Sequence, residues 1–202
     1  MKLYYAPGAC SLAPHIIALE AGLPLALDKF DFASGKTEAG TDFLSVNPKR
    51  QVPTLELDDG ARLTEGSAIM QYLADLKPGS ELLPKLGSMA RYRVLEWLGF
   101  INSEVHKQFS PLFMPGSSDA AKADARANIT KKLGFIETHL AGKTYVAGDH
   151  FTIADAYTFV VLNWTNFVGI DLQPYPNIQA FMKRIGERPK VKDALKAEGL
   201  AA

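Results

Sequence analysis

The sequence predicts an α/β domain followed by an all-helical domain. Short apolar strands alternate with helical segments in the first part of the chain, in the order βαβαββα. A stretch containing Lys77-Pro78-Gly79-Ser80 then interrupts the periodicity. Beyond this stretch, apolar residues recur at three- and four-residue spacing, which is typical of helices that pack against one another. Together these observations indicate the fold class.

The α/β domain is predicted over residues 1–78. Gly22 and Pro24 end its first helix, because Gly favours a left-handed C-terminal cap and Pro cannot continue a helix. Asp58-Asp59-Gly60 is a strong turn signal between two short strands. The predicted elements are strands at 2–5 and 25–32, helices at 11–21, 42–46 and 66–76, and a β-hairpin with strands at 54–57 and 61–64.

Residues 79–86 are predicted to be a linker, and residues 87–202 an all-helical domain. Thr152 and Asp155 have the spacing of a capping box at a helix start, with Asp in the usual place of Glu or Gln. The predicted helices of this domain span 88–109, 120–140, 152–168, 176–186 and 189–198.

Composition excludes several classes of function. The chain has 202 residues, of which 47% are hydrophobic, and this is enough to form a core. Lys plus Arg equals Asp plus Glu, 22 of each, so the net charge favours neither nucleic acid nor an acidic membrane as a partner. One cysteine excludes an intrachain disulfide and a cysteine-based zinc cluster, and the histidines lack the spacing of metal ligands. No metal is therefore predicted.

The sequence also predicts a cytoplasmic protein. Its N-terminus lacks the long apolar segment of a signal peptide. No stretch approaches the roughly 20 apolar residues of a membrane span, so a membrane is not expected as a partner.

Cys10 is the first candidate for chemistry. It stands where a short apolar strand turns into a helix. The first amide groups of a helix are unpaired and the helix dipole is positive there, so a sulfur at this position is favoured as the thiolate. The alternative is structural, because a free cysteine is among the residues most often buried as a small hydrophobic group.

A cysteine at the first strand–helix junction of a βαβαββα unit is the layout of a thioredoxin-like domain. Over essentially its full length, the chain closely resembles the bacterial beta-class glutathione S-transferases, through five segments in the family's order and spacing. These are Ala6-Pro7-Gly8-Ala9-Cys10-Ser11, Asn47-Pro48-Lys49-Arg50-Gln51-Val52-Pro53, Leu63-Thr64-Glu65-Gly66-Ser67-Ala68-Ile69, Glu104-Val105-His106-Lys107 and Phe151-Thr152-Ile153-Ala154-Asp155-Ala156-Tyr157. The resemblance implies the glutathione transferase fold, glutathione as co-substrate and a homodimer.

The resemblance assigns a glutathione site to the first domain. Gly66 and Ser67 open a helix, so their amides suit a carboxylate, while the Glu65 side chain suits the ammonium of the same γ-glutamyl group. Val52 is implied to offer its backbone to the glutathione peptide as an added strand does, and the family implies a cis bond from Val52 to Pro53. Further residues implied to bind glutathione are Ser11, Lys36 and Gln51. Without the resemblance, Glu65 is typical of a helix start and Pro53 of an ordinary turn.

His106 and Lys107 are the candidates in the predicted helix 88–109. The residues seven, four and three positions before His106 are small or polar and share its helical face: Gly99, Asn102 and Ser103. Such a stripe suggests a cleft. The family implies that Cys10, His106 and Lys107 act together at the thiol, where a hydrogen bond and a positive charge favour the thiolate. The alternative for His106 is a hydrogen-bonded residue without a catalytic role.

The chain departs from the family at two positions. It has Gly35-Lys36 where the beta class commonly has Lys-Lys, and Gly99 where the class commonly has Asn. The first change removes one cation that contacts the glycyl carboxylate of glutathione and leaves Lys36 as the predicted partner. Gly99 lowers helix propensity by roughly 1 kcal/mol relative to Ala, which indicates the close approach of a ligand or of backbone. By resemblance, Glu104 contacts glutathione across the dimer.

The predicted activity is conjugation of glutathione to small hydrophobic electrophiles, in detoxification or redox metabolism. Cys10 and His106 are predicted to be catalytic, and a mixed disulfide between Cys10 and glutathione is an additional expected species. Family position places four aromatic residues near the second substrate, although such residues at helical spacing are also typical of a core: Phe109, Phe113, Tyr157 and Trp164. Two alternatives remain, a glutaredoxin-like thiol–disulfide oxidoreductase and a non-catalytic ligand-binding or interaction protein on the same fold.

Overall fold

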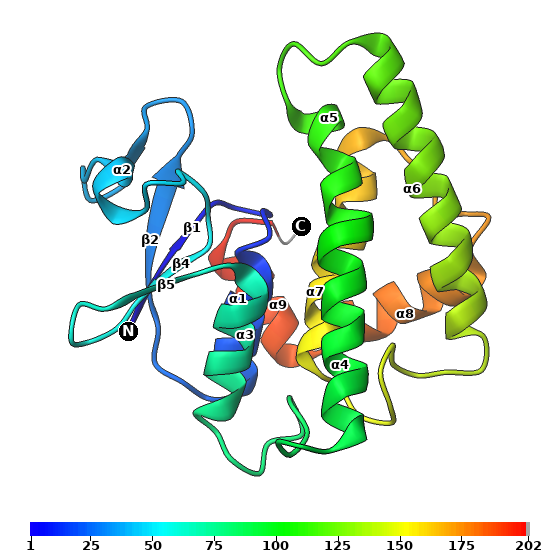
Figure 1. Ribbon diagram of the computed structural model, residues 1–202, viewed down its shortest axis with the longest axis horizontal. Helices are drawn as coiled ribbons and strands as arrows, with labels where there is room; N and C mark the ends of the chain where they lie inside the picture. The colour runs from blue at the N-terminus through cyan, green and yellow to red at the C-terminus, as the bar shows by residue number, and fades with distance from the viewer. Residues whose placement is uncertain (201–202) are drawn as a thin grey trace. The chain divides into compact units, whose positions relative to one another are not determined.

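A computed structural model describes residues 1–200 of the chain as two compact units (Figure 1). The first unit comprises Met1–Leu83 together with the residues from Arg188 onward, and the second comprises Pro84–Glu187. The division therefore falls inside the predicted linker, residues 79–86. The last helix differs from the prediction, which placed it in the helical domain 87–202. A periodic pattern shows that a segment is helical, but it does not show which unit covers its apolar face.

The first unit contains the elements predicted for the α/β domain, one additional strand and the last helix of the chain. Its strands are β1 (Lys2–Tyr5), β2 (Ala26–Asp31), β3 (Lys36–Thr37), β4 (Thr54–Glu56) and β5 (Arg62–Thr64). Its helices are α1 (Leu12–Glu20), α2 (Phe43–Val46), α3 (Gly66–Asp75) and α9 (Pro189–Ala197). The strand β3 was not predicted, because two residues are too few to show an alternating pattern.

The strands form one sheet in the order β3-β2-β1-β4-β5. Tyr4 of β1 pairs with Thr54 of β4, which pairs with Thr64 of β5. The carboxyl end of β1, the start of β4 and the end of β5 therefore lie side by side. On the other side of β1, Asp31 at the end of β2 pairs with Lys36 at the start of β3. Because β1 and β2 are parallel, all five strands bring a loop to this end, which we call the loop end of the sheet.

The sheet is covered on both faces because successive side chains of a strand point to opposite sides. Tyr4 joins a buried cluster with Phe30 of β2 and Phe43 of α2, in which the Phe30 and Phe43 rings stack with centroids 4.1 Å apart. Leu3 is fully buried and faces the opposite side, where α1 and α3 pack against each other (Figure 1). The loop end therefore stands on a rigid base.

The helix α9 is fastened to α1 by apolar packing and by an ion pair. The two helices are in direct contact. Just before α9, Arg188 makes two hydrogen bonds to the carboxylate of Glu20, with N–O distances of 2.7 and 2.9 Å. Val191 and Ala194 of α9 are fully buried. These contacts explain why the C-terminal helix belongs to the first unit.

The second unit is helical, as predicted, but its first long helix is interrupted. The elements are α4 (Met89–Phe100), a π-helical segment η1 (Ile101–Val105), a 3₁₀ segment η2 (His106–Phe109), α5 (Ser110–Phe113), α6 (Asp119–Leu140), α7 (Ile153–Val168) and α8 (Pro176–Gly186). A single helix was predicted over 88–109. Near the interruption, the Ser103 hydroxyl donates to the Gly99 carbonyl over 2.9 Å. Such a bond competes with the regular backbone ladder, and π-helical turns are frequent at functional sites.

The capping box at the start of α7 is confirmed. The Thr152 hydroxyl accepts from the Ala154 N–H, and the Asp155 carboxylate accepts from the Thr152 N–H over 2.9 Å. Asp155 also accepts from the Val146 N–H over 2.8 Å and from the Thr152 hydroxyl over 2.9 Å. This fully buried carboxylate therefore ties the loop before α7 to the helix.

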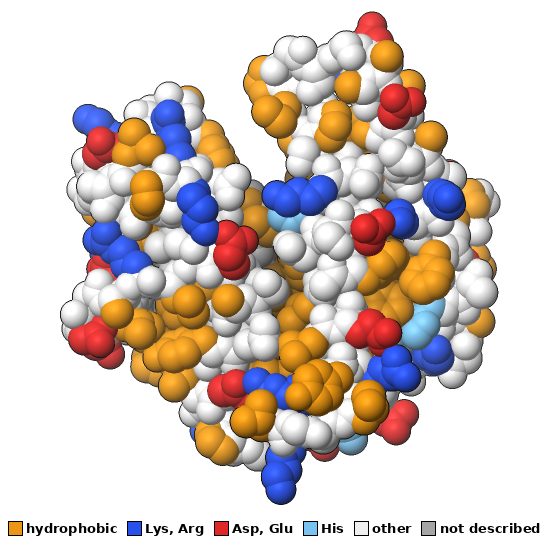
Figure 2. Space-filling view, viewed as in Figure 1, with side chains coloured by type: hydrophobic (Ala, Val, Ile, Leu, Met, Phe, Trp, Pro, Cys, Tyr) orange, Lys and Arg blue, Asp and Glu red, His pale blue; other side chains and the backbone are white. Residues whose placement is uncertain are grey.

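Within residues 1–200, no helix combines the length and the apolar character needed to cross a bilayer. On the face seen in Figure 2, positive and negative side chains are interspersed, in keeping with the balanced formal charge.

Candidate functional site

The loop end of the sheet in the first unit collects three of the predicted glutathione-binding segments. The turn that carries Cys10 follows β1, Val52 and Pro53 precede β4, and Glu65 follows β5 at the start of α3. The register of β1, β4 and β5 places these segments next to one another. Neighbouring strands are about 4.8 Å apart, so one small peptide is long enough to contact all three.

The turn that carries Cys10 is held by a buried serine. The Ser11 hydroxyl accepts from the Ala6 N–H over 3.1 Å and donates to the Ala6 carbonyl over 3.2 Å. Ser11 was predicted to contact glutathione, but its hydroxyl is occupied by these bonds and shapes the turn. Cys10 is half-buried, and its thiol donates to the Val52 carbonyl over 3.3 Å. The sulfur is therefore adjacent to the segment predicted to pair with the glutathione backbone.

A second anchor of this turn comes from the end of the chain. The N–H of Gly8, which has a φ of 71°, donates to Glu198 Oε2 over 3.0 Å. The other carboxylate oxygen of Glu198 lies 2.9 Å from Nδ1 of His15 on α1. Both side chains are buried. Sequence patterns do not reveal Glu198, because its partners lie far away in the chain.

The segment before β4 contains a cis peptide bond between Val52 and Pro53. Asn47, which is almost fully buried, holds this segment. Its amide donates to the Gln51 carbonyl over 2.8 Å and to the Thr54 hydroxyl over 3.1 Å. Sequence reasoning named Asn47 only as part of the family-like segment 47–53, although an Asn before a turn often bonds nearby backbone.

The start of α3 presents an acidic side chain and two amide groups. No residue from 1 to 200 accepts a hydrogen bond from the N–H of Gly66 or Ser67. Unpaired amides at a helix N-terminus favour an anion. Glu65 is exposed and forms an ion pair with Lys49, whose ammonium also donates to the Thr64 hydroxyl over 2.7 Å. An incoming ammonium therefore meets a carboxylate that already binds a cation.

The remaining candidates of the first unit are exposed. Lys36 begins β3 at the loop end, and the Gln51 side chain precedes Val52. Gly35 is buried, with a φ of 72°, and a Cβ at this position would collide with the guanidinium of Arg50. The Arg50 side chain thus occupies the space that a side chain at position 35, such as the one common in the beta class, would need.

In the second unit, His106 belongs to a hydrogen-bonded triad. Its Nδ1 lies 2.6 Å from the Tyr157 hydroxyl oxygen, and that hydroxyl donates to Asn102 Oδ1 over 3.0 Å. Since the tyrosine has one hydroxyl hydrogen, its oxygen is left to accept from Nδ1–H. This arrangement leaves the lone pair of the imidazole on Nε2. Asn102 and Tyr157 therefore orient His106 and select its tautomer.

The charge state of His106 follows from its surroundings. Burial and, to a smaller extent, the charge of the neighbouring Lys107 lower its pKa from 6.5 to about 4. The imidazole is therefore neutral near pH 7, with Nε2 able to accept a proton. Lys107 itself is exposed.

The four aromatic residues assigned to the second substrate do lie together around His106. The His106 ring meets the Trp164 ring edge-on at 4.6 Å, and Trp164 also contacts Phe109 and Phe113 at 5.5 and 5.7 Å. Phe113 is 47% exposed, whereas Phe109, Tyr157 and Trp164 are buried. Phe113 is therefore the ring most available to a ligand, and the others form its base.

Two other predicted features of the second unit have different surroundings from those expected. The Glu104 carboxylate is paired with the Lys132 ammonium over 2.6 Å, so it has a partner within its own chain. Gly99 is exposed, and among residues 1–200 no atom beyond its chain neighbours and the backbone of its own helix lies within 4 Å of a Cβ built on it. Close packing of backbone, which sequence reasoning suggested for Gly99, is therefore not seen.

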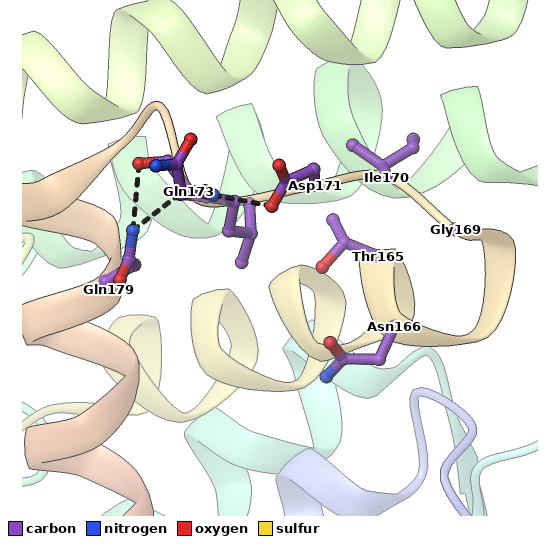
Figure 3. Close-up of a pocket in the computed structure, with 8 residues that line it drawn as sticks. Thr165, Asn166, Gly169, Ile170, Asp171, Gln173 and Gln179 are labelled. Atoms are coloured by element: carbon purple, nitrogen blue, oxygen red, sulfur yellow. Dashed lines mark hydrogen bonds between the residues drawn. The ribbon is translucent and has the colours of Figure 1, made fainter.

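A polar depression in the second unit lies at the end of α7, and none of the candidate residues lines it (Figure 3). Its polar groups bond one another: the Gln179 amide donates to the carbonyls of Leu172 and Gln173, and the Gln173 N–H donates to Asp171. It adds no candidate for chemistry. Among residues 1–200, no group of His, Cys, Asp and Glu side chains is arranged to hold a metal ion.

Comparison with known proteins identifies the family. Residues 8–76 match the glutathione S-transferase N-terminal domain, and residues 100–189 match the C-terminal domain. Glutathione S-transferase GstA of Escherichia coli O157:H7 is 50% identical over 200 residues, which cover 99% of this chain and 100% of the relative. The chain belongs to the glutathione S-transferase family.

Solved structures place this glutathione S-transferase near the beta class. A beta-class glutathione S-transferase of Sphingomonas chungbukensis is 50% identical with a TM-score of 0.97, and each chain is covered completely. A sphingomonad glutathione S-transferase complexed with glutathione is 51% identical with a TM-score of 0.96, again with complete coverage of both chains. The predicted family and fold are thus confirmed.

Three positioning residues of this glutathione S-transferase were missed by sequence reasoning: Asn47, Asn102 and Glu198. Asn102 was noted only for its helical face, four residues before His106. Its role depends on the Tyr157 hydroxyl, which reaches both side chains from another helix. A hydrogen bond between distant positions leaves no periodic signal in a single sequence.

Proposed function

We propose that the protein conjugates glutathione to small hydrophobic electrophiles. The observation that carries this proposal is the loop end of the sheet, where Cys10, the Val52–Pro53 segment and the start of α3 are neighbours. The glutathione complex of the sphingomonad relative supports glutathione as the co-substrate. The site suits a peptide with an α-amino acid at one end and a thiol in the middle.

Each part of glutathione has a candidate partner. The carboxylate of the γ-glutamyl group would bind the free amides of Gly66 and Ser67, and its ammonium would bind Glu65. The cysteinyl backbone would pair with Val52, next to the Cys10 sulfur. Lys36 and Gln51 are assigned to the remaining end of the peptide. Binding in this order holds the thiol in one place, so the enzyme gains rate by proximity.

The chemical step is nucleophilic displacement by sulfur. The glutathione thiol loses its proton, the thiolate forms a bond to the electrophilic carbon, and the leaving group departs with its electron pair. We assign the proton to Nε2 of His106, which carries the lone pair in this structure, and a supporting charge to Lys107. Phe113 and its aromatic base, Phe109, Tyr157 and Trp164, are assigned to the hydrophobic electrophile.

Thiol–disulfide exchange is a second candidate activity, favoured by the position of Cys10 beside Val52. In this reaction the Cys10 thiolate attacks one sulfur of oxidised glutathione. A new disulfide joins Cys10 to one glutathione, and the second glutathione leaves as a thiolate, so no further oxidant is needed. We also propose a homodimeric, cytoplasmic enzyme without a metal. Glu104, which pairs with Lys132 in its own chain, is assigned to contact the glutathione of a second subunit.

The proposed function is tested by replacing Glu65 with Gln. We expect the affinity for glutathione to fall about tenfold or more, because the ammonium loses a charged partner inside the site. Isothermal titration measures the affinity, and the reaction with an activated aryl chloride measures conjugation. Asp59→Asn is the matched control, since Asp59 is exposed in the β4–β5 turn at the opposite end of the sheet. Equal affinities of wild type and Glu65→Gln would contradict the assignment, and a wild type that neither binds nor conjugates would overturn the function.

A second prediction concerns the orientation of His106. Tyr157→Phe removes the hydroxyl that joins His106 to Asn102, so we expect kcat for conjugation to fall about tenfold while the KM for glutathione changes less than about threefold. Tyr145→Phe makes the same chemical change at a partly buried tyrosine elsewhere in this unit and should leave kcat unchanged. A shifted pH profile of kcat would distinguish a change in His106 from a loss of folded protein. An unaltered kcat and pH profile in Tyr157→Phe would exclude the positioning role.

A further inference from the structure

The first unit contains an arginine whose environment points to a ligand. Arg50 is exposed, and no side chain or carbonyl among residues 1–200 accepts a hydrogen bond from its guanidinium. The nearby carboxylates are engaged in their own turns: Asp31 accepts from the N–H groups of Ala33 and Ser34, and Asp42 accepts from that of Leu44. The positive charge of Arg50 is therefore available.

The backbone of Arg50 is also unusual. Its φ is 52°, in the left-handed region that favours glycine, and among residues 1–200 only one other non-glycine residue, Glu65, has a positive φ. A residue with a Cβ is sterically disfavoured in this region. A turn holds the backbone in place, since the Arg50 N–H donates to the Asn47 carbonyl over 2.9 Å. Residues in such conformations concentrate at ligand-binding sites.

Space for the Arg50 side chain is provided by Gly35. A Cβ on Gly35 would overlap the Arg50 guanidinium, so no other residue type fits at position 35 while the arginine keeps this position. Gly35 and Arg50 are thus coupled in space. Position 35 has lost the cation that the beta class commonly has there, and a cation from position 50 occupies the vacated space.

The strand order shows which end of glutathione this charge would meet. Glu65 follows β5 and Val52 precedes β4, whereas Gly35 precedes β3 at the other edge of the sheet. A peptide with its γ-glutamyl group at Glu65 and its cysteine at Val52 extends its glycine toward β3. A fully extended tripeptide spans only about 10 Å, and five strands spaced by about 4.8 Å span about 19 Å. Arg50 stands two residues before Val52, and its guanidinium lies beside Gly35. Its long side chain therefore lies on the side of Val52 toward which the glycine extends.

From these observations we propose that Arg50 is the principal residue that binds the glycyl carboxylate of glutathione in this protein. This inference rests on the proposed function. A guanidinium binds a carboxylate through two parallel hydrogen bonds, a geometry that the ammonium of Lys36 cannot provide. Arg50 and Glu65 would then recognise the two charged ends of the same peptide. Arg50 is a specificity-determining residue in this scheme and takes no part in the chemical step.

The test compares glutathione with its glycyl amide, in which a neutral carboxamide replaces the glycyl carboxylate. Titration calorimetry gives the ratio of the two affinities for wild type, Arg50→Gln, Arg50→Gly and Lys36→Gln. We expect wild type to bind glutathione about tenfold or more tightly than the amide. In Arg50→Gln and Arg50→Gly the ratio should fall below about threefold, because the charge partner is gone. Lys36→Gln should keep most of the wild-type ratio.

The two arginine variants separate charge from folding. Arg50→Gly also removes the left-handed strain, so it should be at least as stable as wild type in thermal unfolding. A wild-type ratio that persists in both arginine variants would overturn the assignment of Arg50. A ratio lost in Lys36→Gln alone would overturn it in favour of Lys36. Failure of wild type to bind either compound would overturn the proposed function itself, and the assignment of Arg50 with it.

Discussion

Replacing Cys10 with alanine is expected to abolish the reversible adduct between the protein and glutathione. Wild type incubated with oxidised glutathione should gain one glutathione by intact-mass analysis, and a reductant should remove it. The alanine variant should gain none, and its transfer activity toward mixed disulfides should fall at least about 100-fold, because the attacking sulfur is missing. Since the chain has one cysteine, the adduct is assigned without further mapping.

The same variant separates the two candidate activities. Conjugation of glutathione to an activated aryl chloride should persist in Cys10→Ala, because the glutathione sulfur, and not Cys10, is the nucleophile in that reaction. Loss of both activities together would favour an oxidoreductase in which Cys10 is indispensable. A wild type without an adduct would show that Cys10 does not react with glutathione under these conditions, which contradicts the second candidate activity.

Asp155→Ala is expected to cause the largest loss of stability. The buried carboxylate accepts from two backbone N–H groups and one hydroxyl, and alanine leaves these donors without an acceptor. We expect the free energy of unfolding to fall by about 3 kcal/mol, which corresponds to a decrease in Tm of about 6–12 °C for a chain of this size. Thermal unfolding measures the change. Asp149→Ala removes an exposed carboxylate of the same loop and should shift Tm little. Equal decreases in Tm for the two variants would show that the hydrogen bonds of Asp155 do not stabilise the fold.

The titration of Asp155 adds a dependence on pH. Burial raises its pKa from 3.8 to about 6, against the opposing effect of its hydrogen-bond donors. Between these values the folded state keeps a proton that the unfolded state releases. The resulting stabilisation is complete below about pH 4 and is lost as the pH rises through 6.

Asp155→Asn, which lacks this titration, provides the reference. We expect the stability of wild type relative to Asp155→Asn to decrease by about 3 kcal/mol between pH 4 and pH 7. Denaturant unfolding at several pH values measures this difference. A relative stability that rises over the same interval would mean that the hydrogen-bond donors outweigh the burial of the charge.

Several features of the fold are encoded locally and were predictable. Gly22, the Asp58-Asp59-Gly60 turn and the Thr152–Asp155 box act through backbone preferences and hydrogen bonds within a few residues. For the same reason the order of strands and helices in the first unit was predictable, apart from the two residues of β3. The break in the predicted helix 88–109 was not predictable. The apolar residues keep a helical spacing through Val105, although the backbone from Ile101 to Val105 is π-helical.

Candidate residues were also predictable by type and position, but not by their partners. The chemistry of Cys10 and Glu65 suits strand–helix junctions and that of His106 suits a polar helix face, and the family resemblance assigned their roles. Ser11 was selected with them, yet its hydroxyl is bound by Ala6. Tyr157 was assigned to a hydrophobic pocket, yet its hydroxyl orients His106. A side chain with both an apolar ring and a hydroxyl gives no local sign of which of the two is used.

By itself, the sequence determined the fold class, the family resemblance and the residue types available for glutathione chemistry. Tertiary structure alone decided that α9 packs on α1, that Glu198 holds the turn before Cys10, and that Arg50 occupies the space beside Gly35. The physical reason is the range of the interactions. Capping, turn formation and periodicity act over a few residues, whereas these contacts join segments whose separation in the chain is unrelated to their distance in space.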